Sequence, residues 1–417
     1  MTGPGVADPA VRQARAWLTR ALEPGSVDAW QYVEEAGPVV AVDALRAGSA
    51  PPAVQALVGT RAGEDTSADD LWRAERCGAR LVVPEDDEWP RYALHCLTLA
   101  AAQQAADRSD GAKAVDRTRS LVPPLALWVR GDARLDDTVD RSVALVGSRA
   151  STAYGEHVAA EVAHGLGERG WTTVSGGAFG IDAAAHRGAL AAGGPTVAVL
   201  ACGVDRAYPA GHSALFARIS DGGLLVSEWP PGCAPLRHRF LVRNRLIAGL
   251  TRGTVVVEAA ARSGALATAH RARDLGRTVM AVPGPVTSAM SVGCHQLLRD
   301  REQGDEQRAA PVLVASAADV VETVGRLGDD LAPLPDRPGD PRDELSDLAR
   351  RVLDACPVRR GVPPERLASV AGVAVVDVLR VLPALELAGL VEWTGTGWRI
   401  APPPTAEERP GPGRGKG

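Results

Sequence analysis

Lysine is almost absent from this chain of 417 residues, since it occurs only at Lys113 and Lys416. Nearly all of the 46 basic residues are therefore arginine, while the formal net charge is −5. Together with abundant Ala, Gly, Pro and Val, this bias is typical of GC-rich codon usage. A run of arginines is thus less informative than usual here, and a solvated charged face stays open as its alternative explanation.

Cysteine pairs are also lacking. The six cysteines are scattered and form neither a C-x-x-C pair nor the spacing of a disulfide framework or zinc site; they are Cys77, Cys96, Cys202, Cys233, Cys294 and Cys356. We therefore expect buried thiols in a reducing compartment, with no metal and no other cofactor.

Long apolar runs and two common signatures are missing as well. No stretch approaches the roughly 18 apolar residues of a membrane-spanning helix, and the opening MTGPGVADPA lacks the basic and apolar regions of a signal peptide. We expect a soluble, cytoplasmic protein that does not contact a membrane. The G-x-x-x-x-G-K-[ST] motif is absent too, which argues against a P-loop nucleotide hydrolase.

The length leaves room for roughly two to three domains. In residues 1–76, apolar residues recur at helical spacing in short segments broken by Gly and Pro, which predicts a helical, SAM-like N-terminal domain. Residues 77–325 form the predicted core, with the polar stretch 98–120 as an insertion or partly disordered loop. Residues 326–345, rich in Pro, Asp and Gly, predict a linker, and 401–417 a disordered tail.

Short runs rich in β-branched residues recur through the predicted core. They cover 142–147, 171–176, 196–203, 223–228, 254–259 and 278–284. Because amphipathic helical stretches lie between most of them, the pattern predicts βαβ units. We expect an α/β fold with a parallel sheet and helices on both faces.

Residues 346–400 have the outline of a winged helix, because three short predicted helices precede GLVEWTGTGWRI, two apolar and aromatic strands around a glycine turn. The expected recognition helix, about 374–388, carries Arg380 against Asp377 and Glu386, with Pro383 in its middle. One base against two acids suits a major groove poorly, and a proline bends a helix. We predict a protein-contact or dimer role, with duplex DNA as the alternative.

Glycine-rich loops follow several predicted strands. In an open parallel sheet, ligands bind beyond the carboxyl ends of the strands, and helix N-termini there offer N–H groups to anions. We therefore predict an anion-binding rim, although a glycine-rich turn is often only structural. The candidates are Gly147, Ser148, Arg149, Ser175, Gly176, Gly177, Phe179, Gly180, Ser263 and Gly264.

The segment 237–245, RHRFLVRNR, concentrates cations around Phe240 just before an apolar helical run. In an acidic chain, such a segment suits a polyanion, because arginines contact phosphate and an aromatic ring stacks on a base. We expect nucleic acid as the partner. Together with Arg149, the residues expected to converge on the rim are Arg239, Arg243, Asn244 and Arg245.

The sequence offers few candidate catalytic residues, and each has a structural alternative. Asp182 and His186, four residues apart on a predicted helix, are either an acid–base pair or a local hydrogen bond. Cys294 and His295 suggest a metal or thiolate site, or a buried turn. Glu258 is either a general base or a residue that holds a loop. Because no nucleophile stands beside a base, we expect no enzymatic activity.

Seven sequence blocks occur in one order over about residues 80–300: VALVGSRASTAYG, VSGGAFGIDAAAHRGAL, TVAVLACGVDRAYPAGH, LLVSEWPPG, FLVRNRLIAGL, VVVEAAARSGALATAHRARDLGRTVMAVPGP and GCHQLL. This order resembles the DNA-processing protein A family, DprA or Smf. The resemblance implies an extended Rossmann-like core, often dimeric, that binds single-stranded DNA without strong sequence preference. It also implies delivery of the RecA recombinase onto that DNA during natural transformation or recombination.

Carried over by position, the resemblance places phosphate contacts at Gly147, Ser148, Arg149, the loop 175–180, Arg243, Arg245, Ser263 and Gly264. Phe179 and Phe240 would stack on bases or fill the core. The chain departs from the family with SGGA in place of SGLA, with His295 in place of an asparagine, and with Arg299-Asp300 in place of Gly-Ala. Two alternatives remain, a phosphoribohydrolase, although its P-G-G-x-G-T-x-x-E stretch is missing, and a nucleotide sensor.

Overall fold

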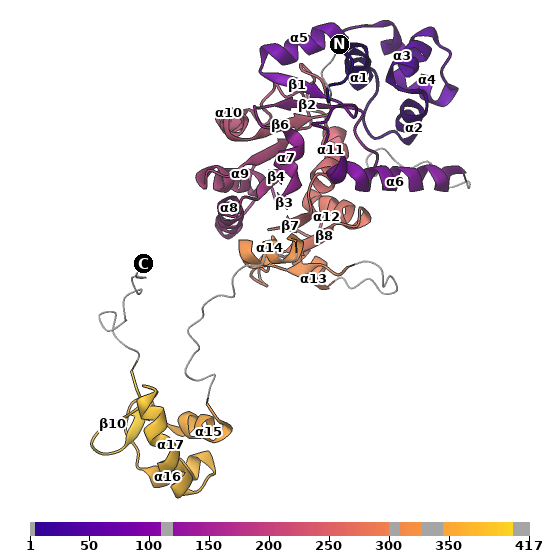
Figure 1. Ribbon diagram of the computed structural model, residues 1–417. Helices are drawn as coiled ribbons and strands as arrows, with labels where there is room; N and C mark the ends of the chain where they lie inside the picture. Colours follow the sequence, from indigo (N-terminus) through magenta and orange to yellow (C-terminus); the bar gives the residue numbers. More distant parts are fainter. Residues whose placement is uncertain (1–4, 110–119, 300–308, 327–344, 403–417) are drawn as a thin grey trace. The chain divides into compact units, whose positions relative to one another are not determined.

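The computed structural model of the chain describes residues 5–109, 120–299, 309–326 and 345–402. It separates into two compact units, Met1–Ala332 and Pro333–Gly417 (Figure 1). The first unit contains the sheet and all the predicted binding residues. Each unit is described by itself.

The first unit begins with a group of helices whose starts follow from the sequence. The side chains of Asp8 and Ser26 cap two of them by accepting hydrogen bonds from backbone N–H groups, and proline opens three. Trp17, Leu18 and Leu45 are buried in their shared core. The elements are α1 (Pro9–Ala21), α2 (Val27–Ala36), α3 (Pro38–Ala47), α4 (Pro52–Val58), the 3-10 helix η1 (Gly59–Gly63) and α5 (Ser67–Arg76). They lie in the predicted helical region 1–76; the domain boundary at residue 76 stays a prediction.

A nine-stranded sheet runs through this unit in the order β1-β2-β6-β5-β4-β3-β7-β8-β9. Across the sheet, the seven strands from β6 to β9 are all parallel to their neighbours. Strand β2 is antiparallel to β6, and β1 is antiparallel to β2. The six predicted strands are confirmed as β3 to β8. The strands are β1 (Ala79–Val82), β2 (Leu127–Arg130), β3 (Ser142–Val146), β4 (Thr172–Ser175), β5 (Thr196–Val199), β6 (Leu224–Ser227), β7 (Gly253–Val256), β8 (Thr278–Ala281) and β9 (Val312–Leu313).

Helices cover both faces of the sheet, as predicted (Figure 1). One layer contains α8 (Ala153–Glu168), α9 (Ile181–Ala191), η2 (Ala210–His212), α10 (Ser213–Gly222) and α14 (Ala317–Val324). The other contains α6 (Arg91–Ser109), α7 (Leu135–Asp140), α11 (Arg237–Gly249), α12 (Gly264–Asp274) and α13 (Val292–Arg299). Strand β3 shows why both layers form: Val143 and Leu145 pack toward the first, and Ala144 and Val146 toward the second.

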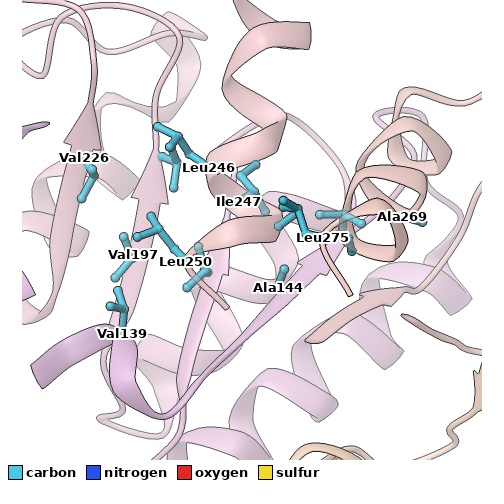
Figure 2. Close-up of a cluster of buried hydrophobic side chains, with 14 of the residues drawn as sticks. Val139, Ala144, Val197, Val226, Leu246, Ile247, Leu250, Ala269 and Leu275 are labelled. Atoms are coloured by element: carbon cyan, nitrogen blue, oxygen red, sulfur yellow. The ribbon is translucent and has the colours of Figure 1, made fainter. Parts of the chain in front are cut away.

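Helix α11 is anchored to the sheet by its C-terminal half. Figure 2 shows Leu246, Ile247 and Leu250 in one apolar cluster with strand residues such as Val197 and Val226. Because α11 follows β6, its first residues lie near the carboxyl ends of the parallel strands. Apolar packing under the sheet thus positions the basic first turns of this helix.

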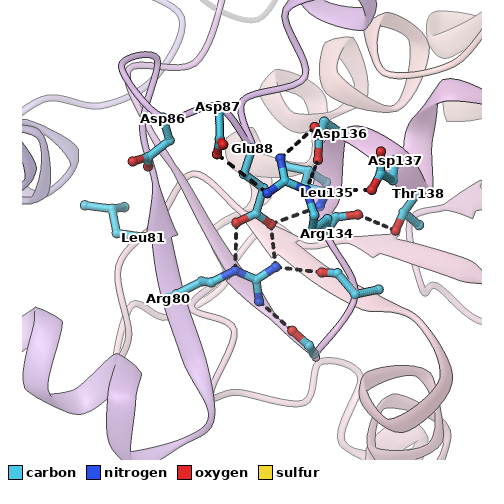
Figure 3. A network of polar contacts seen from close by, with 12 residues as sticks. Arg80, Leu81, Asp86, Asp87, Glu88, Arg134, Leu135, Asp136, Asp137 and Thr138 are labelled. Atoms are coloured by element: carbon cyan, nitrogen blue, oxygen red, sulfur yellow. Dashed lines mark hydrogen bonds and ion pairs between the residues drawn. The ribbon is translucent and has the colours of Figure 1, made fainter. Parts of the chain in front are cut away.

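A network of ion pairs joins the start of the core to α7 (Figure 3). Arg80 Nε, on β1, donates to Glu88 Oε2 at 3.0 Å, and the backbone N–H of Leu135 donates to Glu88 Oε1 at 2.9 Å. Arg134 pairs with Asp136 at 2.9 Å. The contacts of Glu88 fix the connections around β1 and β2, whereas the Arg134 pair lies at the surface.

The predicted loop over 98–120 is wrong for residues 98–109, which belong to α6. Leu97 and Ala101 are fully buried and Ala105 packs beside them, so one residue every four forms a narrow contact stripe. Alanine suits both a helix and a close contact. This stripe of small residues is weaker than the usual apolar face, which is why the sequence resembled a loop. Residues 110–119 lie outside the described part of the chain.

The second unit contains the predicted three helices and hairpin, namely α15 (Asp347–Ala355), α16 (Pro364–Ala371), α17 (Val375–Leu387), β10 (Val391–Trp393) and β11 (Trp398–Ile400). Its core includes Val352, Leu367 and Leu382, and Pro383 lies inside α17. The assignment as a winged helix stays a prediction. Of the predicted linker and tail, residues 327–344 and 403–417 lie outside the described chain.

Three further features bear on the sequence analysis. All six cysteines are free. Within the described ranges no group of three or more His, Cys, Asp or Glu side chains is placed to hold a metal ion. No single described helix is long and apolar enough to cross a membrane, although the bent pair Pro364–Ala371 and Val375–Leu387 passes by length and composition, with a 105° bend.

Candidate functional site

An open pocket of about 440 Å³ lies at the carboxyl ends of the central strands. Strand β3 lies between β4 and β7, so the order of strands reverses direction there, and such a switch point opens a crevice between the loops. The loop after β3 and the first turns of α9, α11 and α12 line the pocket. It brings together seven predicted residues: Gly147, Ser148, Arg149, Arg243, Asn244, Ser263 and Gly264.

The loop after β3 is held by Glu258, a buried residue just beyond β7. Its carboxylate accepts hydrogen bonds from Thr152 N at 2.9 Å and Thr152 Oγ1 at 2.6 Å, and its backbone oxygen accepts from Ser148 N at 2.8 Å. Of the two roles considered for Glu258, these contacts favour the structural one. The loop it holds is the one that carries Arg149.

Replacing Glu258 by glutamine is expected to lower the free energy of unfolding by about 1–3 kcal/mol, because an amide replaces a buried charged acceptor of two hydrogen bonds. Urea denaturation followed by tryptophan fluorescence measures this change. An exposed carboxylate on the same unit, Glu161, provides the matched control as Glu161→Gln. Equal stability of both variants would contradict the role of Glu258 as a loop anchor.

Arg149 is exposed beside the pocket, and its side chain makes no hydrogen bond or ion pair with any residue that the structure describes. Its guanidinium carbon lies 5.2 Å from the centre of the Phe240 ring. Phe240 is half-buried and lines the pocket, so this ring borders the solvent as well as the core. A cation and an aromatic ring thus stand side by side at the pocket, ready for an anion and a flat apolar group.

Arg243 forms part of the pocket wall and is almost fully buried. Its Nη1 donates to Gly176 O at 3.0 Å and also to Val199 O, and its Nε donates to Asn244 Oδ1 at 3.3 Å. Burial lowers its pKa to about 10, so the guanidinium is still protonated at neutral pH. Burial raises the pKa of the neighbouring Asp182, while Arg243 acts in the opposite direction.

Glycine is required in the loop after β4. A Cβ on Gly176 would lie 2.5 Å from Arg243 Nη2, and Gly177 and Gly180 adopt φ values of 69° and 76°. Ser175 is buried and donates to Leu145 O at 2.6 Å. These four predicted residues shape the loop and do not line the pocket. Phe179 lies outside the pocket lining too, and is 52% exposed.

Arg239 and Arg245 do not converge on the pocket, contrary to prediction. Arg245 is fully buried and donates to both carboxylate oxygens of Glu228, at 2.6 Å each. Arg239 is buried and pairs with Glu23 from the connection between α1 and α2. The reason is that 237–245 lies within α11 and not before it, so the helix directs these two arginines inward.

The candidate acid–base pair does not form one site. Asp182 lines the pocket, whereas His186 is fully buried with its Nδ1 2.8 Å from Thr196 Oγ1. Burial lowers the pKa of His186 to about 3. The second candidate pair lies in α13, where Cys294 is buried and burial raises its pKa to about 12, and His295 Nε2 is 3.0 Å from Gly284 O.

Among the polar and aromatic residues of this region, the sequence did not point to Thr268 or Tyr208. Thr268 lines the pocket, and its position four residues after Gly264 on α12 was the available signal. Tyr208, in the connection between β5 and α10, lies with its ring centre 5.6 Å from that of Phe240. No local sequence pattern predicts this contact, because Tyr208 and Phe240 are 32 positions apart in the chain.

Comparison with known proteins shows the family of the chain. The model of the family DNA recombination-mediator protein A matches residues 112–312. A Mycobacterium tuberculosis (strain H37Rv) protein, provisionally named DNA processing protein DprA, is 49% identical over 389 residues, 93% of this chain and 94% of that protein. Protein Smf of Escherichia coli K12 is 38% identical over 64% of this chain and 69% of its own. The X-ray structure of DNA processing protein A from Streptococcus pneumoniae covers 77% of this chain and 100% of that one, with a TM-score of 0.58 and 29% identity. By this likeness along nearly its whole length, the chain belongs to the DNA recombination-mediator protein A family, DprA or Smf.

Proposed function

We propose that the protein binds single-stranded DNA at the pocket without catalysing a reaction, and delivers it to the RecA recombinase in transformation or recombination. The observation that carries this proposal is Arg149, exposed beside the pocket with its guanidinium over Phe240. The guanidinium suits a phosphate and the ring suits an unstacked base. Because any base presents a flat face, stacking favours single strands of any sequence.

The rest of the pocket supports phosphate binding. Helix α12 begins at Gly264 after Ser263, and both residues line the pocket. Ser263 accepts from Ala265 N at 3.3 Å and from Leu266 N at 3.2 Å, so Gly264 N is the N–H group at this end that we propose for an anion, which the helix dipole also favours. A Cβ on Gly264 would meet nothing within 4 Å, so the backbone is open to a close ligand.

The carboxylates near the pocket support a binding role over a catalytic one. Asp182 lies beside the buried Arg243, and Glu258 accepts two hydrogen bonds from Thr152. Both are engaged in holding the walls of the pocket. The description of the family as recombination mediators supports delivery to a recombinase.

The second unit supports a contact with protein, including a second copy of the chain. Val376, Leu379 and Leu387 on α17 are 64%, 53% and 92% exposed, and Pro383 lies on the same face. Exposed apolar side chains at this spacing suit a protein surface better than a phosphate backbone. Under this proposal the predicted winged helix makes a homodimer or partner contact, and residues 77–325 bind the DNA.

Replacing Arg149 by alanine is expected to weaken binding of single-stranded DNA and to reduce the slope of log K against log salt by about 0.7, because one phosphate contact is lost. Fluorescence anisotropy with a labelled oligonucleotide across a salt series measures both quantities. Arg218→Ala, at an exposed arginine of α10, is the matched control. If Arg149→Ala leaves both affinity and slope at the values of the control, the pocket is not the phosphate site.

The same titration separates the alternatives. A mononucleotide sensor or a phosphoribohydrolase would show saturable mononucleotide binding with no preference for longer strands. A single-stranded DNA-binding protein would prefer the strand over both the mononucleotide and a duplex of equal length. The duplex arm also tests whether the second unit reads double-stranded DNA.

A further inference from the structure

We infer that Phe179 and Tyr208 form a second base-stacking surface beside the pocket, built on the connection between β5 and α10. The inference rests on the proposed binding of single-stranded DNA. It assigns to this surface the bases next to the nucleotide that the pocket would hold. Under this inference, the strand extends beyond the pocket across the first layer of helices.

Aromatic rings from three separate segments meet at this surface. The ring centre of Tyr208 lies 5.6 Å from that of Phe240 on α11. The ring centre of Phe179, from the loop after β4, lies 4.5 Å from that of His212 in η2. Tyr208 and His212 are four residues apart on one connection, so the two pairs of rings share this segment; we call these rings the aromatic row.

The exposure of these rings distinguishes them from core residues. Phe179 is 52% and Tyr208 47% exposed in a chain with only 4% aromatic residues, although Phe179 packs on the buried His212 and Tyr208 on the half-buried Phe240. His212, by contrast, is buried, and its Nδ1 lies 3.0 Å from Gly177 O. His212 is thus a positioning residue that supports one side of Phe179 and leaves much of its ring open to solvent.

The charges around the row favour nucleic acid as its occupant. Arg206, two residues before Tyr208, and Arg237, at the start of α11, are both exposed. The nearby acid Asp205 accepts hydrogen bonds from Gly232 N at 2.9 and 3.0 Å, so its carboxylate is engaged. Exposed rings with exposed cations nearby in sequence suit the bases and phosphates of a single strand.

The test pairs ring-removing variants with DNA that lacks bases. Phe179→Leu and Tyr208→Leu, in the full-length protein, keep an apolar side chain but lose the ring. Both are titrated with a thymidine oligonucleotide and with the same oligonucleotide carrying abasic positions, across a salt series. Tyr92→Leu, at a tyrosine of α6 that is 96% exposed, is the matched control. Thermal unfolding of each variant verifies that it is folded.

If the rings stack on bases, each variant binds the thymidine oligonucleotide roughly fivefold more weakly, at an unchanged salt slope. The wild type binds abasic DNA more weakly than the thymidine oligonucleotide, and on abasic DNA each variant binds as tightly as the wild type. If a variant loses affinity equally on both DNAs relative to the wild type, or on neither, the inference is overturned. The surface would then suit a protein partner. If Arg149→Ala still lowers affinity and slope in that case, the proposed function stands and only the stacking surface fails. No single-strand binding by the wild type would overturn both.

Discussion

Replacing Glu228 by alanine is expected to lower the free energy of unfolding by about 3–5 kcal/mol, because it leaves a buried guanidinium without its carboxylate. Arg245 is 0% exposed and Glu228 3%, and the partners meet in two hydrogen bonds of 2.6 Å. Val122 O also accepts from Arg245 Nε at 2.8 Å, but a carbonyl cannot balance the charge. Urea denaturation at neutral pH measures the loss.

Two controls define this effect. The double variant Glu228→Leu with Arg245→Met replaces the pair by apolar groups, and we expect it to recover most of the lost stability, because the desolvation cost disappears with both charges. Arg134→Ala breaks only ion pairs at the surface, and we expect its free energy of unfolding to equal that of the wild type. If Glu228→Ala behaves like Arg134→Ala, the buried pair is not a structural element.

The second large effect depends on pH and concerns His186. Its pKa is lowered to about 3 in the folded state, against 6.5 for an ordinary histidine. Between these values the unfolded chain binds a proton that the native protein does not, so stability is full above pH 6.5 and falls as the pH falls. At about 1.4 kcal/mol per pH unit, the loss from pH 6.5 to pH 4 amounts to about 3 kcal/mol.

Burial gives the direction of this shift, and the hydrogen bonds of His186 show which nitrogen would have to take up the proton. Thr196 Oγ1 donates to Thr173 O at 2.8 Å, so it accepts from the protonated Nδ1 of His186. Nε2 has no partner among the described residues, and a proton there would be buried and unpaired.

Replacing His186 by glutamine removes this titration. The difference in unfolding free energy between wild type and His186→Gln, measured in urea at pH 7 and at pH 4, should shift by about 3 kcal/mol in favour of the variant at pH 4. His270→Gln, at an exposed histidine of α12, should show no such shift. A difference that does not change with pH would contradict this account.

The sequence predicts the parallel part of the sheet well, because strands buried on both faces need continuous β-branched runs. The two antiparallel strands are harder to predict. Strands β1 and β2 are four residues each, and their pairing depends on partners such as β6, about 95 residues after β2. Helix α6 was missed because its contact stripe consists largely of alanine, which local hydrophobicity does not separate from a polar loop.

The candidate binding residues divide in the same way. Loop residues such as Ser148, Arg149 and Gly264 were predicted correctly as neighbours of one pocket, because the carboxyl ends of parallel strands meet at one edge. The role of the basic segment 237–245 was harder to predict, since the sequence shows where the arginines are but not which acidic residues pair with them. Glu23, the partner of Arg239, is 216 residues away. With the segment placed inside a helix, its periodicity would have separated exposed Arg237 from buried Arg239, because residues two apart lie on opposite faces of a helix.

The cations at the pocket are guanidinium groups, and this has a practical consequence for chemical footprinting. Amine-directed labels and cross-linkers have only Lys113, Lys416 and the amino terminus to attack, none of them in the described part of the chain. Arginine-selective dicarbonyl reagents have the opposite preference. Arg149 is exposed and without an acidic partner among the described residues, whereas Arg245 is buried and paired, so bound DNA should protect the first from modification and leave the second unreacted throughout.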